Sequence, residues 1–381
     1  MPYYQNPQSY NVQAIGLGKA FVNMGFDYDY VCPKDKEEKT WTFYENNGCK
    51  GRCLEISRVR FIRWGIFTKI LNRKFLKQYD IIISQEYYQI MTFLLGKMSD
   101  KVVMYNGPYY NLFMFPFFSP IYDFFFTKRI DDVVKLKFVK SVLSKDYLEN
   151  KGYHNVINVG VGLDIFRFKN PNPVSENTKE IVDYMKKNRC ILYIGNLMDR
   201  KNYPFMLKLY ERLLDKYQDL KFVVIGKSKI GPFSKMIGGK DEDYEQKLIP
   251  TIPEKVKQGI YRVQRIDNEQ LKYIYPLAKA FILPSKKEIF GMVLPEAMYL
   301  GAPVVTTKNG GSMTLIGEKG PGIMIDGFSL ELWVDAVSKL VDDVEYNEQI
   351  KKQARKLIIE QYTWDAIARK MLNSINKYCI L

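Results

Sequence analysis

Two glutamates, Glu288 and Glu296, flank seven residues in a segment that follows an apolar run and opens a helix-like stretch. Gly291 lies between them, where a residue without a side chain lets the backbone approach a ligand closely. The backbone N–H groups of Gly291, Met292 and Val293, at the expected helix start, can hold a phosphate. Glu288 can accept hydrogen bonds from sugar hydroxyls, and Glu296 from the two hydroxyls of a ribose. The glutamates alone also fit surface salt bridges and a charge at a helix start.

The residues around the two glutamates extend this pattern. From Pro284 to Gly311 the sequence is Pro-Ser-x-x-Glu-x-Phe-Gly-x-x-x-Pro-Glu-Ala-Met-x-x-Gly-x-Pro-Val-Val-x-Thr-x-x-Gly-Gly. This run resembles the E-x7-E motif of the family 4 retaining glycosyltransferases, which have the GT-B fold. Other segments that resemble parts of that family are Ile194–Asn202, Val223–Gly226, Leu271–Ala278 and Tyr362–Trp364.

The resemblance implies a role for each matching residue. Glu288 would contact hydroxyls of the donor sugar, and Glu296 would bind the ribose. Lys201 would neutralise the donor diphosphate as charge develops on the leaving group. The other residues that the resemblance assigns to substrate are Phe290, Gly291, Met292 and Val293 with Gly195, Asn196 and Arg200 at the diphosphate, and Arg265 and Ile266 near the base.

The chain departs from the family on the donor side at one position. Asn196 stands where the family has an arginine, and Arg200, beside Lys201, is the candidate replacement. We expect a retaining glycosyltransferase that moves a sugar from a nucleotide diphosphate to a saccharide or lipid-linked acceptor, in cell-surface polysaccharide or glycolipid synthesis. The alternative function, which the missing arginine motivates, is a catalytically silent scaffold or partner protein with the same fold.

The acceptor side departs further. The family often has a histidine after the middle strands of its first domain, whereas Gln85-Glu86 and Tyr105-Asn106-Gly107 stand there in this chain. The segment Ser9–Leu17 takes the place of a Gly-Gly loop, with a very short or missing strand before it. Gly16 and Asn106 are therefore the acceptor-side candidates. A retaining transfer can proceed without the histidine, because the leaving phosphate can take the acceptor proton.

The elements that must position these residues are short apolar runs that alternate with amphipathic stretches. This alternation predicts parallel sheets, whose ligands bind at the carboxyl ends of the strands. The expected fold is α/β, with two Rossmann-like domains facing a cleft. The proline-rich segment Lys169–Ser175 is the expected linker. We expect an acceptor-binding domain at residues 1–168, joined by a C-terminal helix at 364–381 that crosses back, and a nucleotide-sugar domain at 169–363.

The charge and the single histidine narrow the chemistry. The 57 Lys and Arg against 42 Asp and Glu give a net charge of +15, which favours an acidic partner. We expect a donor diphosphate and no nucleic acid, because no RNA-recognition or zinc-finger signature is present. His154 is the one histidine, which excludes a His-rich zinc site.

We expect neither a metal nor a cofactor besides the donor substrate. Asp27-Tyr28-Asp29 and Asp241-Glu242-Asp243 resemble the D-x-D of metal-using glycosyltransferases, but neither adjoins the nucleotide segments. The five cysteines are too few for a disulfide framework in 381 residues. Cys49 and Cys53 have a spacing that can bind metal, although reduced structural thiols are the more common state of such residues.

Two stretches bear on membranes. Residues 58–77 hold seven basic and no acidic side chains, with Phe61, Trp64, Phe67 and Ile70 at helical spacing. This pattern predicts a basic amphipathic helix, which either binds an anionic membrane surface or packs on the core. The aromatic stretch 109–126 can line a pocket for a lipid-linked acceptor, dip into the interface or pack in the core. Without a signal peptide or a long apolar run, we expect a cytoplasmic protein, peripheral on the inner membrane face if the helix binds lipid.

Overall fold

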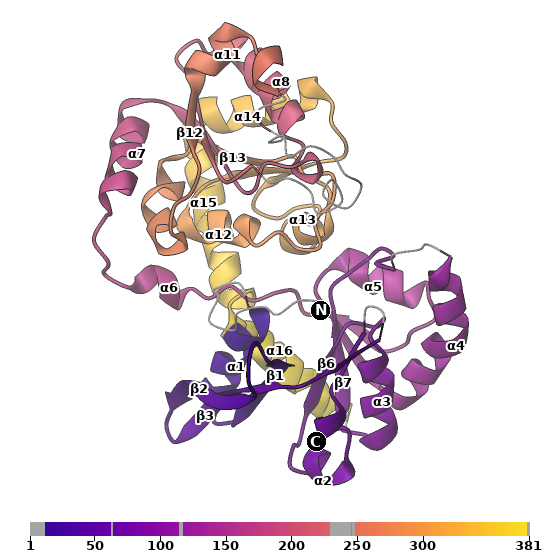
Figure 1. The fold of residues 1–381 in the computed structure, drawn as a ribbon. Helices are drawn as coiled ribbons and strands as arrows, with labels where there is room; N and C mark the ends of the chain where they lie inside the picture. Colours follow the sequence, from indigo (N-terminus) through magenta and orange to yellow (C-terminus); the bar gives the residue numbers. More distant parts are fainter. Residues whose placement is uncertain (1–11, 62–63, 114–116, 229–244, 246–247, 379–381) are drawn as a thin grey trace. The chain divides into compact units, whose positions relative to one another are not determined.

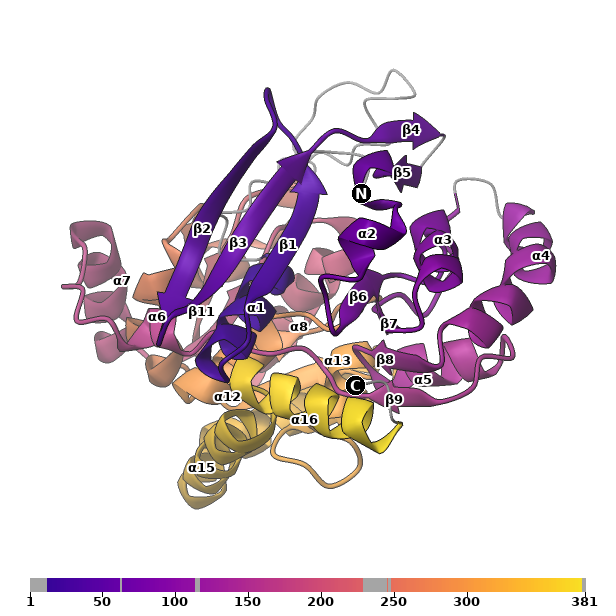
Figure 2. The same cartoon turned by 90° about the horizontal axis from the view of Figure 1, so that it is seen from below.

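The computed structural model describes residues 12–61, 64–113, 117–228, 245 and 248–378 (Figures 1 and 2). The chain divides into two compact units. The first unit comprises residues 1–164 with 361–381, and the second comprises residues 165–360. This division falls within a few residues of the domain boundaries predicted from the linker. The short strand expected before Ser9 lies outside the described residues.

The centre of the first unit is a four-stranded parallel sheet with the order β6-β7-β8-β9. Its strands are β6 (Ile82–Gln85), β7 (Val102–Asn106), β8 (Leu136–Val139) and β9 (Val156–Asn158). The helices that connect them are α3 (Ile90–Met98), α4 (Phe118–Val133) and α5 (Val142–Glu149). β6 and β7 are two of the short apolar runs from which the sequence predicted a parallel sheet.

A second, three-stranded sheet precedes this one. β1 (Tyr28–Pro33) pairs parallel with β3 (Cys49–Ile56), and β2 (Lys39–Asn46) pairs antiparallel with β3. Two helices from opposite ends of the chain pack together beside this sheet, α1 (Gln13–Asn23) and α16 (Trp364–Lys377). The final helix thus returns to the first unit, as the resemblance implied.

The prediction of a basic amphipathic helix at residues 58–77 is wrong. The segment forms a hairpin of β4 (Val59–Phe61) and β5 (Trp64–Ile66), then the 3-10 turn η1 (Thr68–Ile70) and the single-turn helix α2 (Arg73–Leu76). Val59 and Phe61 are two residues apart, as are Trp64 and Ile66, and this spacing of β-branched and aromatic residues favours two short strands. Asn72 then starts α2, because its side chain accepts from Phe75 N at 2.7 Å. The membrane surface assigned to this helix therefore loses its basis.

The second unit is built on a six-stranded parallel sheet with the order β12-β11-β10-β13-β14-β15. The strands are β10 (Cys190–Ile194), β11 (Lys221–Ile225), β12 (Ile260–Val263), β13 (Ala280–Leu283), β14 (Val304–Thr307) and β15 (Ile323–Ile325). β10, β13 and β14 are buried along their whole length, as expected of a sheet covered on both faces.

Helices and 3-10 turns alternate with these strands along the chain, as in other α/β folds. They are α6 (Phe166–Lys169), α7 (Glu176–Lys187), η2 (Asp199–Lys201), α8 (Tyr203–Lys216), η3 (Ile249–Thr251), α11 (Glu254–Gly259), η4 (Asn268–Tyr273), η5 (Tyr275–Leu277), α12 (Val293–Leu300), α13 (Gly310–Leu315), α14 (Leu330–Asp342) and α15 (Val344–Gln361). The segment 268–277 forms two 3-10 turns in place of one regular helix, because Pro276 cannot continue a regular helix. No helix in the described part of the chain is long and apolar enough to cross a membrane.

Candidate functional site

Two loops at the same edge of the second sheet bring Lys201 and Glu288 together. One loop leaves β10 and forms η2, and the other leaves β13 and contains Glu288. Since β10 and β13 are parallel neighbours, both loops leave the sheet at its carboxyl edge, where open α/β sheets bind ligands. Lys286 N donates to Arg200 O at 2.9 Å and ties the two loops together.

Glu288 is held between two cations. Its Oε1 forms an ion pair with the Lys201 ammonium, and its Oε2 lies 3.0 Å from Arg200 Nη1. Arg200 Nη1 also donates to Lys287 O at 2.7 Å, which fixes the guanidinium over the loop. Glu288 is 6% exposed and Lys201 is 8% exposed. Both carboxylate oxygens are therefore covered by positive charge in a nearly dry position.

The charge states of this cluster follow from burial and from the pairing. Burial works to raise the pKa of Glu288, but Lys201 and Arg200 together outweigh it and hold that pKa below its ordinary value. Burial lowers the pKa of Lys201, and the carboxylate of Glu288 opposes that shift. Glu288 is thus an ionised carboxylate at neutral pH, between cations that an incoming anion can share.

The loop after Glu288 turns sharply into helix α12. Gly291 has φ of +73°, a left-handed conformation that favours glycine, and Met292 then caps α12. The first residues of α13 pack against the same loop. Gly310 N donates to Glu288 O at 3.2 Å, and a Cβ on Gly311 would lie 1.7 Å from Phe290 O. The N–H groups of Gly291, Met292 and Val293 thus stand at a fixed helix start.

Glu296 lies on α12 and is 3% exposed. Its Oε1 accepts from Asn268 Nδ2 at 3.2 Å and lies 4.0 Å from Arg167 Nη1. Arg167 in turn donates to Asn268 Oδ1 at 2.8 Å, which closes the cluster. Burial raises the pKa of Glu296 to about 7, although Arg167 and Asn268 act to lower it. The sequence pattern missed both partners, because Arg167 falls beside the predicted linker and Asn268 precedes the segment at 271–278 that resembles the family.

The remaining donor-side residues lie on the same sheet edge. Gly195 and Asn196 follow β10, and Asn196 O accepts from the Tyr193 hydroxyl at 3.1 Å. Gly195 has φ of +153°, and its carbonyl lies 1.8 Å from the place of a Cβ on Gly226. Glycine at 226 therefore lets the loops after β10 and β11 approach each other.

Arg265 and Ile266 follow β12, which β11 separates from β10. The Arg265 side chain is exposed and lies 3.8 Å from Asp267. Neither residue touches the Glu288 or Glu296 clusters in the contacts found among the described residues. Their assignment to the base therefore remains a prediction.

The two residues predicted on the acceptor side, Gly16 and Asn106, both have structural roles. Gly16 lies inside α1, where an added Cβ would be 2.1 Å from Trp364 Nε1, so glycine is needed for packing on α16. Asn106 is fully buried. Its amide accepts from Tyr87 N and donates to Pro108 O and Ser144 Oγ, which uses both of its N–H bonds inside the fold. Asn106 thus orders the strand end rather than offering donors to a substrate.

A charged pair that the sequence pattern missed lies beside Asn106. Lys140 Nζ is 3.4 Å from Glu86 Oε1, and it stacks over the Tyr105 ring with 4.9 Å to the centroid. Glu86 Oε2 accepts from Gly107 N at 3.1 Å. Glu86 has φ of +69°, an uncommon left-handed conformation for a residue with a side chain, and such strain concentrates at functional sites. The pair follows β6 and β8, at the carboxyl edge of the first sheet.

The side chains of Asp27 and Asp29, which the sequence offered for metal binding, form hydrogen bonds and ion pairs with other residues. Asp29 pairs with Arg52 at 2.7 Å and accepts from the Tyr79 hydroxyl, and Asp27 accepts from Lys50 N. Cys53 is a buried free thiol, with 3.5 Å between its sulfur and that of Cys32. Within the described residues no cluster of three His, Cys, Asp or Glu side chains can hold a metal. The motif at 241–243 lies outside the described residues.

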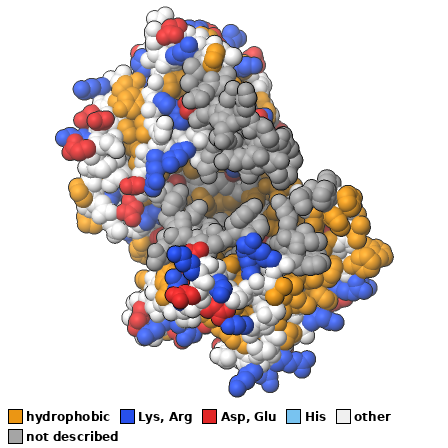
Figure 3. Space-filling model, in the orientation of Figure 1, with side chains coloured by type: hydrophobic (Ala, Val, Ile, Leu, Met, Phe, Trp, Pro, Cys, Tyr) orange, Lys and Arg blue, Asp and Glu red, His pale blue; other side chains and the backbone are white. Residues whose placement is uncertain are grey.

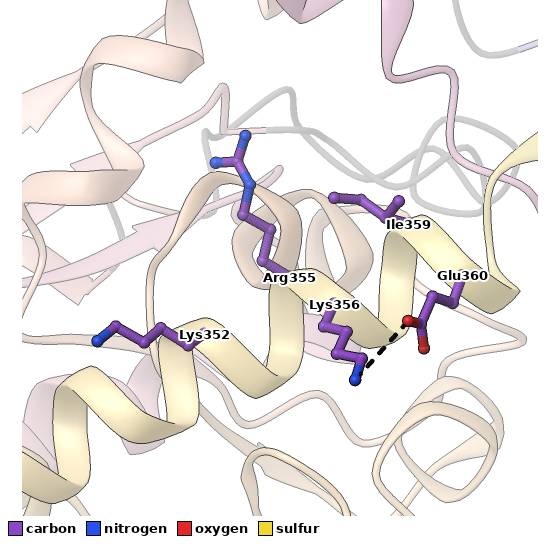
Figure 4. A pocket seen from close by; sticks show the side chains of 5 residues that line it. All are labelled: Lys352, Arg355, Lys356, Ile359 and Glu360. Carbon is purple, nitrogen blue, oxygen red and sulfur yellow. Dashed lines mark ion pairs between the residues drawn. The ribbon is translucent and has the colours of Figure 1, made fainter.

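A shallow hollow on α15 is a separate feature. Figure 4 shows its lining side chains, Lys352, Arg355, Lys356, Ile359 and Glu360. Lys356 pairs with Glu360 at 3.9 Å, and Arg355 stacks over Tyr299 with 4.9 Å to the centroid. All five residues come from one helix face, and none belongs to the clusters around Glu288 and Glu296.

Known proteins show what the chain is similar to. The family model of group 1 glycosyl transferases matches residues 174–357, about half of the chain. Residues 174–357 are therefore similar to the group 1 glycosyl transferases. The matched segment contains Lys201, Glu288 and Glu296, whereas Arg167, which lies 4.0 Å from Glu296, precedes it.

Two curated relatives match about half of the chain. An uncharacterized glycosyltransferase of Methanocaldococcus jannaschii is 26% identical over 197 residues, which are 52% of this chain and 47% of that protein. The D-inositol 3-phosphate glycosyltransferase of Corynebacterium urealyticum is 26% identical over 218 residues, which are 55% of this chain and 48% of that protein. The chain thus spans about half the length of the curated relatives it matches.

Solved structures extend the similarity to both units. A structure described as trehalose-6-phosphate from E. coli bound with UDP-2-fluoro glucose has a TM-score of 0.72 with 11% identity, over 99% of this chain and 98% of that one. At this identity the match shows the fold alone. Both units therefore have the α/β fold with parallel sheets that the sequence predicted.

The buried carboxyl of Glu296 predicts a pH-dependent stability. Its pKa is raised to about 7 in the folded chain, so folding favours the protonated form. Its contribution is largest below about pH 4.5 and is lost as the pH rises through about 7, by up to about 3 kcal/mol. Denaturant unfolding of the wild type and of Glu296→Gln at about pH 5 and about pH 8 measures this. We expect a smaller loss in the variant, and an equal loss would contradict the assignment.

Proposed function

We propose that this protein is a retaining glycosyltransferase. It would move a sugar from a nucleotide diphosphate donor to a saccharide or lipid-linked acceptor, in the synthesis of cell-surface polysaccharide or glycolipid. The observation that carries this proposal is the buried cluster of Glu288 with Lys201 and Arg200 at the carboxyl edge of the second sheet. A cytoplasmic location is part of the proposal.

The donor diphosphate would bind where the cations and the helix start meet. Lys201 and Arg200 would donate some of their hydrogen bonds to the phosphate oxygens and fewer to Glu288. The N–H groups of residues 291–293 would hold the distal phosphate. Glu288, released from part of its pairing, would accept hydrogen bonds from donor sugar hydroxyls. Arg200 would serve in place of the arginine that Asn196 replaces. These cations are sufficient to carry the diphosphate charge, so we propose no metal cofactor.

The transfer step itself would need no protein base. The bond between the anomeric carbon and the diphosphate oxygen breaks, and the acceptor oxygen forms its bond to the same face of that carbon. The acceptor proton passes to the departing phosphate oxygen, so charge and atoms balance. Lys201 and Arg200 stabilise the charge that grows on the diphosphate, and fixed charges at such a position are a major source of rate enhancement.

Similar proteins support the donor class. The E. coli structure of the same fold is described with UDP-2-fluoro glucose, and the curated relatives are glycosyltransferases. The alternative of a silent scaffold rests on Asn196. The position of Arg200, 3.0 Å from Glu288, favours the active enzyme, because a second cation is present without the usual arginine.

For the acceptor side, we propose the pair of Glu86 and Lys140. Both side chains are mostly buried, yet they are polar and lie at the carboxyl edge of the first sheet. A carboxylate and an ammonium side by side can accept and donate hydrogen bonds to the hydroxyls of a saccharide. The strained backbone of Glu86 is consistent with a geometry kept for binding.

The donor assignment predicts a specific pattern of loss. A panel of nucleotide sugars is screened for hydrolysis or transfer with the wild type, Lys201→Met and Glu288→Gln. We expect at least about a hundredfold loss of turnover in both variants. Lys308→Met is the matched control, because Lys308 follows β14 on the same edge but pairs with Asp326. Full activity in either variant would contradict that residue's role, and a wild type that binds no nucleotide would favour the scaffold.

The ribose assignment predicts a pH-dependent affinity. Ribose hydroxyls donate best to an ionised carboxylate, and the pKa of Glu296 is about 7. The affinity for UDP-glucose should therefore rise about tenfold between about pH 6 and about pH 8, and the rise should disappear in Glu296→Gln. Calorimetric titration measures both. A wild-type affinity that does not change with pH would contradict this role.

The acceptor assignment predicts that donor and acceptor functions separate. With a donor found in the screen, Glu86→Gln and Lys140→Met should retain donor affinity and hydrolysis but lose about tenfold or more in transfer. Glu149→Gln, which alters an exposed ion pair on α5, is the matched control. Equal loss of hydrolysis and transfer would show that the pair acts on folding or on the donor instead.

A further inference from the structure

Helix α4 has two apolar faces, of which the core uses one. Its inner face places Tyr122, Phe126 and Ile130 in the core of the first unit. Tyr122 stacks on Phe126 with ring centroids 4.7 Å apart, and Phe126 packs edge-on against Phe93 of α3 at 5.6 Å. This face explains why the helix is folded and where it is attached.

The outer face of α4 is equally apolar but exposed. Phe124 is 82% exposed, and the other large side chains of this face are also exposed to solvent. Their spacing of three and four residues places them on one side of the helix. The outer face of α4 consists of Phe117, Phe118, Ile121, Phe124 and Phe125.

Two basic side chains and one exposed acid lie near this face. Lys128 and Arg129 are exposed on the next turn, and the Arg129 guanidinium donates to Phe125 O, which places it beside the phenylalanines. Asp123 on the same helix pairs with Lys151. Figure 3 shows hydrophobic side chains gathered at the right-hand edge of the view, where Figure 1 has α4. Asp132, on the last turn, is the exposed acid of the helix.

We propose that the outer face of α4 docks the protein on an anionic lipid bilayer. A helix that exposes phenylalanines beside Lys and Arg has the composition of helices that lie in the membrane interface, with rings at the acyl boundary and cations at the phosphates. The bilayer suits this face because its charge is complementary to Lys128 and Arg129, and its apolar layer takes all five side chains at once. A contiguous exposed apolar patch of this kind commonly marks an interaction surface.

This surface replaces the one that the sequence predicted at residues 58–77. There the basic residues accompany a hairpin and short turns, so they do not form one amphipathic helix face. On α4 the apolar and basic residues share a regular helix of 16 residues. The proposal does not depend on glycosyl transfer, because vesicle binding is measured without any substrate.

Flotation of the full chain with vesicles tests the proposal. Vesicles of phosphatidylcholine alone and of phosphatidylcholine with phosphatidylglycerol are compared. We expect the wild type to float with the anionic vesicles, and Phe124→Ser/Phe125→Ser to lose about tenfold or more of the bound fraction. Lys128→Gln/Arg129→Gln should lose most of the preference for phosphatidylglycerol. Leu332→Ser/Val344→Ser, which alters exposed apolar residues of the second unit, should float like the wild type.

Further measurements keep the test decisive. The single variant Phe124→Ser changes a side chain with few contacts, so it should fold and still lose binding. A wild type that stays unbound on both vesicles would overturn the proposal, as would undiminished flotation of the phenylalanine variants. Light scattering after size exclusion chromatography tests whether a second copy of the chain covers this face instead. A wild-type dimer that Phe124→Ser converts to a monomer, without vesicle binding, would assign the face to a second copy of the chain.

Discussion

The second unit depends on one buried charge cluster, Glu288 between Lys201 and Arg200. Taking a carboxylate and an ammonium out of water is costly, and the pair is stable here because each carboxylate oxygen faces its own cation. Removing one partner of such a pair costs roughly 3–5 kcal/mol. The cluster therefore fixes the loops after β10 and β13 against each other, and it keeps positive charge at a position where a diphosphate can share it.

The backbone around this cluster serves the same arrangement. Gly291 turns the chain into α12 with a left-handed conformation, and the missing side chain of Gly311 lets α13 start against Phe290. The sheet supplies the rigid edge, since β10 and β13 are entirely buried. Rigid loops at such an edge hold charges in place before a ligand arrives, which is the condition for electrostatic stabilisation of a transition state.

The sequence predicted most of the second unit and less of the first. The alternation of apolar runs with amphipathic stretches, and the spacing of Glu288 and Glu296, are local patterns that can be recognised along the chain. Arg167 and Asn268 could not be found this way, because they meet Glu296 through tertiary packing of segments with no pattern of their own. The helix expected at 58–77 failed for a different reason. Apolar residues there fit both periods, and alternating Val and Ile with large aromatic residues decided for strands.

The most direct test of the central claim is calorimetric titration of UDP into the wild type, Lys201→Met and Glu288→Gln. If Glu288 competes with the diphosphate for the two cations, Glu288→Gln should bind UDP at least as tightly as the wild type. Lys201→Met should bind it about tenfold or more weakly. Equal affinity of Lys201→Met and the wild type, or loss of UDP binding in a folded Glu288→Gln, would contradict the account.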